Sequence, residues 1–152
     1  MQVRLLACLL TATLLGVTGM ANATDKAKTP SASAVKKAKE LVEKGNKMDD
    51  AGKTEKAMGA YKSAIKLNPQ SFEANFNLGF AQLKSGDHVA AETSLKAATA
   101  LDPKDSEAFK LLGVACIKQG KQDEALNAWK TSLELDPKQP DVKKFLEMHE
   151  AK

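Results

Sequence analysis

The chain has 152 residues, 28% of them charged, and a formal net charge of +4. This length suits one domain, and the lysines are interspersed with aspartate and glutamate, which argues against a nucleic-acid or anionic-membrane surface. Of the two cysteines, Cys8 falls in an expected leader and Cys116 remains. The chain after the leader therefore has no internal disulfide, and its stability must come from packing.

Residues 1–23 have the three regions of a secretory signal peptide. Met1 to Arg4 is a short positive start, Leu5 to Val17 is an uncharged apolar run, and Ala21-Asn22-Ala23 supplies small residues for cleavage. We expect cleavage after Ala23 and export, with the bacterial periplasm as the location. The alternative is a retained membrane anchor, although the run is shorter than the ~20 apolar residues that span a bilayer.

Residues 24–33 are expected to form a flexible tether, because they are rich in Lys, Ala, Thr, Ser and Pro and contain nothing to pack. Ser33 is a candidate helix cap, since its hydroxyl can accept a hydrogen bond from a free backbone N–H. Apolar residues then recur at helical spacing from Ala34 and Val35. This pattern continues to about His149 with regular interruptions.

The interruptions recur at a constant interval of 34 residues. The columns in this register are Asn68-Pro69, Asp102-Pro103 and Asp136-Pro137; Gly45, Gly79 and Gly113; Gly52, Gly86 and Gly120; Ala57, Ala91 and Ala125; and Leu67, Leu101 and Leu135. Such a period indicates stacked helix pairs, none of which can bury its apolar face alone. The second glycine column is expected to end each first helix, since glycine tolerates left-handed backbone. The prolines end the second helices from outside.

These columns resemble the tetratricopeptide repeat. The second and third copies match at Leu78-Gly79, Ala91, Leu95, Ala98, Pro103, Leu112-Gly113, Ala125, Trp129 and Pro137. The first copy matches at Gly45, Ala57, Tyr61, Ala64 and Pro69, and departs at Lys44, where the family favours an apolar residue. The resemblance implies an all-α fold, a right-handed superhelical stack of antiparallel helix pairs. We assign repeats to residues 34–71, 72–105 and 106–139, and a capping helix to 140–152 that covers the last apolar face.

The small residues are interpreted as packing features. Gly45, Gly79 and Gly113 are expected where the two helices of a pair come close, so that a larger side chain would force them apart. Tyr61, Leu95 and Trp129 share one column on the second helices and are predicted to be core. Trp129 is expected to pack toward the capping helix; a ligand-stacking role is the alternative.

No catalytic, metal-binding or cofactor-binding constellation emerges from the sequence, so we predict a protein that is not an enzyme and has no small-molecule substrate. His88 and His149 lie far apart and have no metal-like spacing with Cys116. His88 is expected to be solvated, and Cys116 to be a buried free thiol or, alternatively, to pair between chains. The Asp49-Asp50 pair lies at an expected helix end, which suits exposure and implies no raised pKa.

The resemblance also implies a concave groove lined by the first helix of each repeat. In the family's register its residues are Val42, Asn46 and Asp49; Glu73, Phe76, Asn77, Phe80, Leu83 and Lys84; and Glu107, Lys110, Leu111, Val114, Ile117 and Lys118. Among them a contiguous apolar patch is expected, formed by Phe76, Phe80, Leu83, Val114 and Ile117. An exposed patch of this kind marks an interaction site; the alternative is that the stripe is core.

Some relatives hold the C-terminal carboxylates of chaperone tails with two asparagines and three basic residues. Asn46 and Asn77 match the asparagines, but Val42, Glu107 and Leu111 stand at the basic positions, so this binding mode is not expected. The apolar stripe suits an amphipathic helix or an extended peptide instead. Phe76 and Phe80 would anchor it, and Lys84, Lys110 and Lys118 would favour an acidic partner.

We therefore predict a non-catalytic scaffold or adaptor that binds a protein or peptide partner. By family analogy alone, it would serve in bacterial envelope assembly. The alternative is a self-assembling structural protein, a homo-oligomer in which the groove takes a neighbouring subunit's tether or capping helix.

Overall fold

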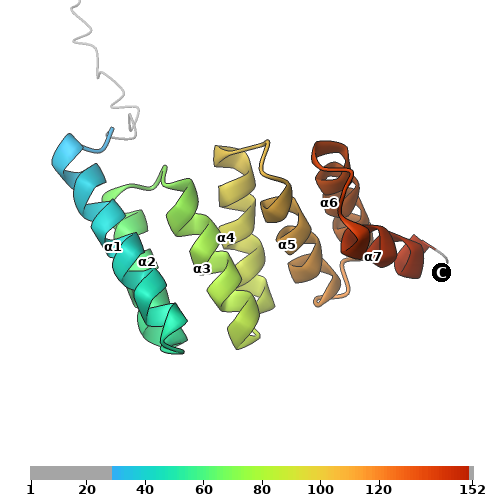
Figure 1. The fold of residues 1–152 in the computed structure, drawn as a ribbon, viewed down its shortest axis with the longest axis horizontal. Helices are drawn as coiled ribbons and strands as arrows, with labels where there is room; N and C mark the ends of the chain where they lie inside the picture. Colours follow the sequence, from blue (N-terminus) through green and yellow to red (C-terminus); the bar gives the residue numbers. More distant parts are fainter. Residues whose placement is uncertain (1–28, 151–152) are drawn as a thin grey trace, which may run out of the picture.

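The computed structural model describes residues 29–150, so the expected signal peptide and residues 24–28 of the expected tether lie outside the described part. Seven helices and no strand occupy these residues (Figure 1). They are α1 (Ala32–Asp50), α2 (Thr54–Leu67), α3 (Phe72–Ser85), α4 (His88–Leu101), α5 (Ser106–Ile117), α6 (Gln122–Leu135) and α7 (Pro140–Glu150). None of these helices combines the length and apolar character needed to cross a bilayer.

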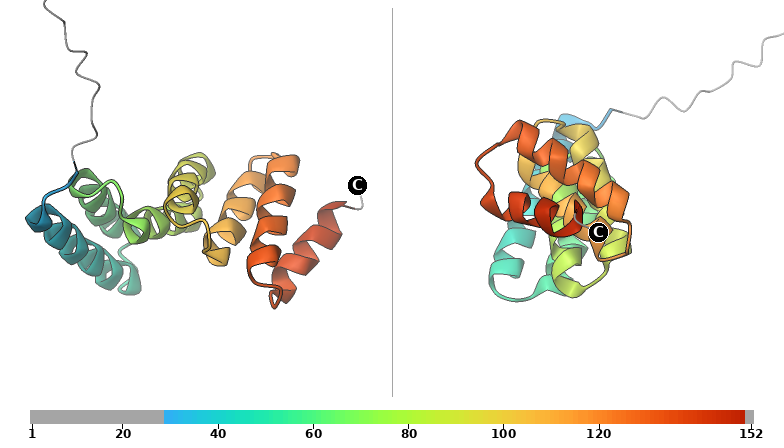
Figure 2. Two further views of the ribbon diagram at one scale, coloured as in Figure 1. Left: turned by 90° about the horizontal axis from the view of Figure 1, so that it is seen from above. Right: turned by 90° about the vertical axis from the view of Figure 1, so that its right-hand side faces the viewer.

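The helices form three antiparallel pairs, α1/α2, α3/α4 and α5/α6, each of which packs on the next, and α7 covers α6 (Figure 1). The pairs are progressively rotated along the stack (Figure 2). This arrangement confirms the predicted all-α, right-handed superhelical stack of helix pairs.

The helix ends follow from residues at fixed places in the period. Gly52, Gly86 and Gly120 have φ of 72°, 83° and 76°, so the predicted left-handed glycine stands between the two helices of every pair. The first helix of the stack begins earlier than expected. Its cap is Ser31, whose Oγ accepts from the N–H of Ala34 at 3.2 Å, and not Ser33, which lies inside α1.

The corners between pairs share one hydrogen bond. The side-chain oxygens of Asn68, Asp102 and Asp136 each accept from the backbone N–H two residues later, at 3.2, 3.0 and 3.0 Å. This local bond stabilises a turn. The following proline cannot donate to the ending helix, so the Asn/Asp-Pro column both ends the second helix and shapes the corner.

The close approach of paired helices depends on the other glycine column. A Cβ built on Gly45 would lie 2.8 Å from Tyr61 Cδ1, one on Gly79 2.6 Å from Leu95 Cγ, and one on Gly113 2.7 Å from Trp129 Cε2. No side chain fits at these distances. The packing roles predicted for Gly45, Gly79 and Gly113, and for their three large partners, are therefore confirmed.

The capping helix α7 covers the last pair as predicted. Its Val142 is fully buried, and the Trp129 ring stacks on Phe145 and His149 with centroids 5.2 and 5.5 Å apart. The indole N–H of Trp129 donates to the carbonyl of Lys110 at 3.2 Å. Trp129 is thus a core residue with its polar atom satisfied, which leaves no face for the alternative ligand-stacking role.

Candidate functional site

The first helices of the three pairs, α1, α3 and α5, lie side by side, since α1 contacts α3 and α3 contacts α5. This row is the face on which the resemblance places the groove. Every groove residue derived from the sequence lies on one of these three helices, apart from Lys118, which immediately follows α5.

A polar centre joins α1 to α3 on this face. The Oδ1 atom of Asn46 accepts from the hydroxyl of Tyr61 and from Nδ2 of Asn77, both at 2.9 Å. Tyr61 belongs to α2, and its buried ring extends beneath α1 so that only its hydroxyl reaches the groove. Burial, together with the charges of Asp49 and Asp50, raises the pKa of Tyr61, so the hydroxyl remains a proton donor.

A second polar link lies one turn further along α1. Lys84 Nζ donates to both carboxylate oxygens of Asp49 at 2.8 and 2.9 Å, and Asp49 Oδ1 also accepts from the hydroxyl of Thr54 at 2.9 Å. The hydrogen bond from Lys84 outweighs burial and lowers the pKa of Asp49. The same ammonium group lies 5.6 Å from the centroid of the Phe80 ring. Asp49 is therefore half-buried and paired, whereas the sequence suggested an exposed carboxylate.

Two cavities open along the α1/α3 boundary. One, of about 190 Å³, is lined by Asn46, Asp49, Asp50, Tyr61, Asn77 and Phe80. The other, of about 230 Å³, is lined by Lys39, Val42, Glu43, Ser71 and Glu73. Each has room for part of a side chain and offers both polar and apolar walls.

The predicted apolar patch is only partly open. Val42 and Leu111 are 8% and 9% exposed and belong to the core, although Val42 also forms part of the wall of the larger cavity. Half-buried side chains from α3 and α5 pack against the C-terminal core, namely Phe76, Leu83, Val114 and Ile117. Phe80 alone among the patch residues is exposed, at 42%. The stripe is mainly core with one exposed aromatic ring, which is closer to the alternative stated for it.

The lysines expected on the rim are mostly paired within the chain. Lys84 is held by Asp49, while Lys110 pairs with Glu107 and lies 3.4 Å from Asp141 of α7. Burial opposes the charge of Lys110, but the two carboxylates prevail and raise its pKa. Only Lys118 of these three is exposed without a partner among the described residues. Of the three charges expected to favour an acidic partner, only that of Lys118 is therefore uncompensated in the described part of the chain.

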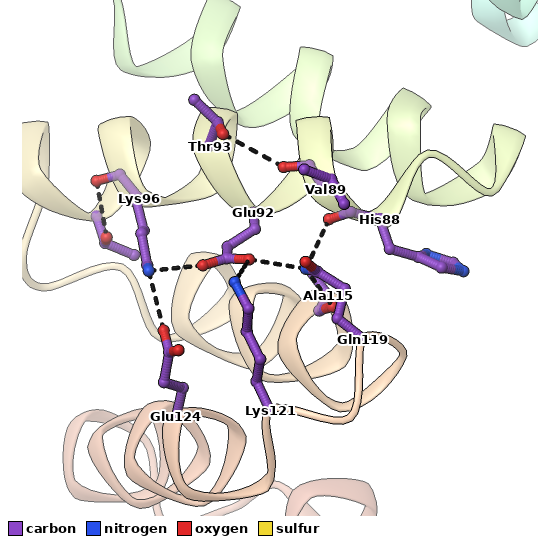
Figure 3. A network of polar contacts seen from close by, with 10 residues as sticks. His88, Val89, Glu92, Thr93, Lys96, Ala115, Gln119, Lys121 and Glu124 are labelled. Carbon is purple, nitrogen blue, oxygen red and sulfur yellow. Dashed lines mark hydrogen bonds and ion pairs between the residues drawn. The ribbon is translucent and has the colours of Figure 1, made fainter.

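A polar network that joins α4, the end of α5 and α6 involves no groove residue (Figure 3). Glu92 of α4 is buried and accepts from Lys96 and Lys121, both at 2.6 Å, and from Gln119 at 2.7 Å. The hydrogen bonds from Lys121 and Lys96 lower the pKa of Glu92 to about 2. Lys96 also bonds Glu124 at 2.9 Å, so the network ties three consecutive helices together.

Cys116 lies beside this network, and its sulfur and one oxygen each of Glu92 and Glu124 are within 4.8 Å of one another. A metal ion there would have to displace the ammonium groups of Lys96 and Lys121 from Glu92, so the arrangement favours ion pairing. Cys116 is 1% exposed, and burial raises the pKa of its thiol. The prediction of a buried free thiol is confirmed.

His88 differs from the expected solvated residue. It is half-buried, and its Nδ1 atom is enclosed without a hydrogen-bond partner among the described residues. Its carbonyl oxygen accepts from Gln119 at 3.1 Å. His88 thus joins α4 to the connection between α5 and α6 through its backbone.

A family model described as tetratricopeptide repeat matches residues 50–114 and 83–148, well over half of the chain. The chain belongs to the tetratricopeptide repeat family. Comparison with curated protein sequences gives no significant match.

Solved structures, among them tetratricopeptide repeat domains, superpose well on this chain. The first such domain of Spaghetti (RPAP3), solved bound to the HSP90 peptide SRMEEVD, has a TM-score of 0.74 and 26% identity over 77% of this chain and 93% of that one. The Arabidopsis OM64 domain has a TM-score of 0.73 and 25% identity, covering 76% and 95%. MamA has a TM-score of 0.72 and 24% identity, covering 74% and 66%, and supports the fold alone.

Sequence reasoning missed five residues that line the two cavities of this tetratricopeptide repeat protein, namely Lys39, Glu43, Asp50, Tyr61 and Ser71. Asp50 and Glu43 line the two cavities, and the hydroxyl of Tyr61 is part of the polar centre. Tyr61 could have been found, because a buried phenol needs a hydrogen-bond partner, and its equivalents Leu95 and Trp129 differ from it. The two carboxylates gave no comparable signal among many surface charges.

Proposed function

We propose that this protein is a non-catalytic adaptor that binds a peptide or an amphipathic helix of another protein along α1 and α3. The supporting observation is the pair of cavities on the row of first helices, one of which is lined by the exposed Phe80. A peptide that fills both would contact side chains of two repeats at once. The relative RPAP3 was solved with a peptide bound, and tetratricopeptide repeats are in general interaction modules without catalysis.

The second part of the proposal is a role in bacterial envelope assembly, and it rests on the export signal predicted for residues 1–23. It is tested by N-terminal sequencing of the protein recovered from the periplasmic fraction of a bacterial host. A chain that begins at Thr24 supports export. An uncleaved chain in the membrane or cytoplasmic fraction contradicts it and leaves peptide binding unaffected.

Affinity capture from envelope extract tests the binding function. Residues 24–152 would be compared with a Phe80→Glu variant and a matched Val89→Glu control, since Val89 is 65% exposed on α4, a second helix. Phe76 is left unchanged because it packs against the core. A partner retained by the control and lost by Phe80→Glu supports the proposal. Capture of the same chain alone, with a mass that rises with concentration, would indicate self-assembly instead.

A further inference from the structure

The chemistry of the α1/α3 cavities specifies the kind of segment that the groove accepts, an inference that rests on the proposed peptide-binding function. Each cavity combines two carboxylates with one cation. One cavity is lined by Glu43, Glu73 and Lys39. The other is lined by Asp49 and Asp50, and the ammonium group of Lys84 pairs with Asp49. Counted this way, each cavity carries an excess of one negative charge, in a chain whose net charge is +4.

The excess charge is available to a ligand. Glu43 and Asp50 are exposed and form no hydrogen bond or ion pair with any described residue. Lys84, in contrast, is committed to Asp49. An incoming carboxylate would therefore meet unpaired carboxylates, whereas an incoming ammonium or guanidinium group would neutralise them.

The cavity walls also suit a cation. Besides Asp49 and Asp50, the Asp50 cavity is lined by Phe80, the buried Tyr61 and the two asparagines Asn46 and Asn77. Lys84 already demonstrates the arrangement inside the chain, since its ammonium lies between the carboxylate of Asp49 and the face of Phe80. A guanidinium group is well suited to stack on a ring while it bonds a carboxylate.

The two cavities have a fixed spacing. Along α1, each residue that lines the first cavity is followed seven positions later by one that lines the second. The pairs are Lys39 and Asn46, Val42 and Asp49, and Glu43 and Asp50. Seven residues of α-helix span about 10 Å. A ligand can place two side chains about 10 Å apart if they are about seven residues apart in a helix, or about three residues apart in an extended segment.

From this geometry we infer that the α1/α3 groove binds a basic polypeptide segment, with two lysine or arginine side chains about 10 Å apart, one in each cavity. The partner is thus opposite in charge to the acidic segment expected from the sequence. It also differs from the acidic peptide SRMEEVD seen with RPAP3, because the unpaired charges beside the two cavities here are the carboxylates of Glu43 and Asp50.

The test measures fluorescence anisotropy with short peptides that are acetylated and amidated. One helical peptide carries two arginines seven residues apart, one extended peptide carries them three apart, and matched peptides replace both arginines by citrulline or by glutamate. The protein is compared with Glu43→Gln/Asp50→Asn and with the control Glu55→Gln/Asp123→Asn, which makes the same charge change at exposed sites on second helices.

Either arginine peptide should bind more tightly than its citrulline counterpart, with an affinity that falls as salt rises. The groove variant should weaken this binding by about tenfold, and the control variant should not. Asp50→Lys should abolish it. Equal weakening in groove and control variants, tighter binding of the glutamate peptide, or no arginine-peptide binding at about 1 mM would each overturn the inference. A captured partner that depends on Phe80 but not on Glu43 and Asp50 would also overturn it while leaving the adaptor function intact.

Discussion

Replacing Gly113 by alanine should destabilise the protein, although alanine is the better helix former. Gly113 lies within α5, and its missing side chain leaves room for the Trp129 indole. A Cβ built on Gly113 would lie 2.7 Å from Cε2 of this indole, and Nε1 and Cδ1 would be closer still. Trp129 is 1% exposed and cannot swing into solvent. The added methyl group must therefore displace the ring, or separate α5 from α6.

The magnitude follows from opposing effects. Alanine gains about 1 kcal/mol over glycine inside a helix. Overpacking a filled core costs about 1–3 kcal/mol, and here the upper end applies because the ring is fixed by Phe145 and His149. Moving the ring also weakens the hydrogen bond from Trp129 to Lys110, which contributes about 1 kcal/mol. The net loss should be about 2–3 kcal/mol.

Gly59→Ala is the matched control, because Gly59 lies inside α2 with nothing within 4 Å of a built Cβ. It should raise the stability by about 0.5–1 kcal/mol. Urea and thermal unfolding followed by circular dichroism would measure both, with a change of about 4 °C in Tm for each kcal/mol. If Gly113→Ala is as stable as Gly59→Ala, the close approach of α5 and α6 does not depend on this glycine and the reasoning is refuted.

Two further predictions concern the polar network and the thiol beside it. Glu92 has a folded pKa of about 2 against an ordinary 4.5, so its contribution is present above pH 4.5 and is lost as pH falls toward 2. Because Lys96 and Lys121 are half-exposed, solvent weakens these ion pairs. We therefore expect the difference in unfolding free energy between the native chain and Glu92→Gln to shrink by about 1–2 kcal/mol over this range. Urea midpoints from pH 5 to pH 2.5 would measure this difference, and a constant value would contradict the ion pairing. Cys116 should react with a thiol reagent only on unfolding, since it is buried and its pKa is raised; labelling of the native protein at the rate of a free thiol would disprove its enclosure.

The fold could be predicted from the sequence because packing repeats itself. A glycine facing a large residue, a left-handed glycine and an Asn/Asp-Pro corner each recur in every pair, and three occurrences of one physical requirement are difficult to mistake. The start of α1 was missed because no earlier copy fixes its register there. Ser31 and Ser33 have the same capping chemistry, and only the structure distinguishes them.

The groove was harder to predict because exposure and pairing depend on neighbouring repeats. Phe76 is half-buried because it packs against the C-terminal core, whereas Phe80, one turn later on α3, is exposed. Lys84 was taken for a free charge because its partner Asp49 lies a whole repeat away in the chain. An ion pair between two repeats cannot be recognised from the 34-residue period, because neither residue's position in that period indicates its partner.

Positions that change from one repeat to the next therefore carry the information about function. In the period of 34 residues, Asn46 corresponds to Phe80 and Val114, and Asp50 corresponds to Lys84 and Lys118. The glycines on which the close packing of the pairs depends keep one residue type in this period. The first repeat instead places an amide and a carboxylate where the others place apolar and basic side chains. The polar centre and both cavities lie where this unusual repeat meets the second, so the proposed partner would distinguish this end of the stack from the other and bind in a defined position.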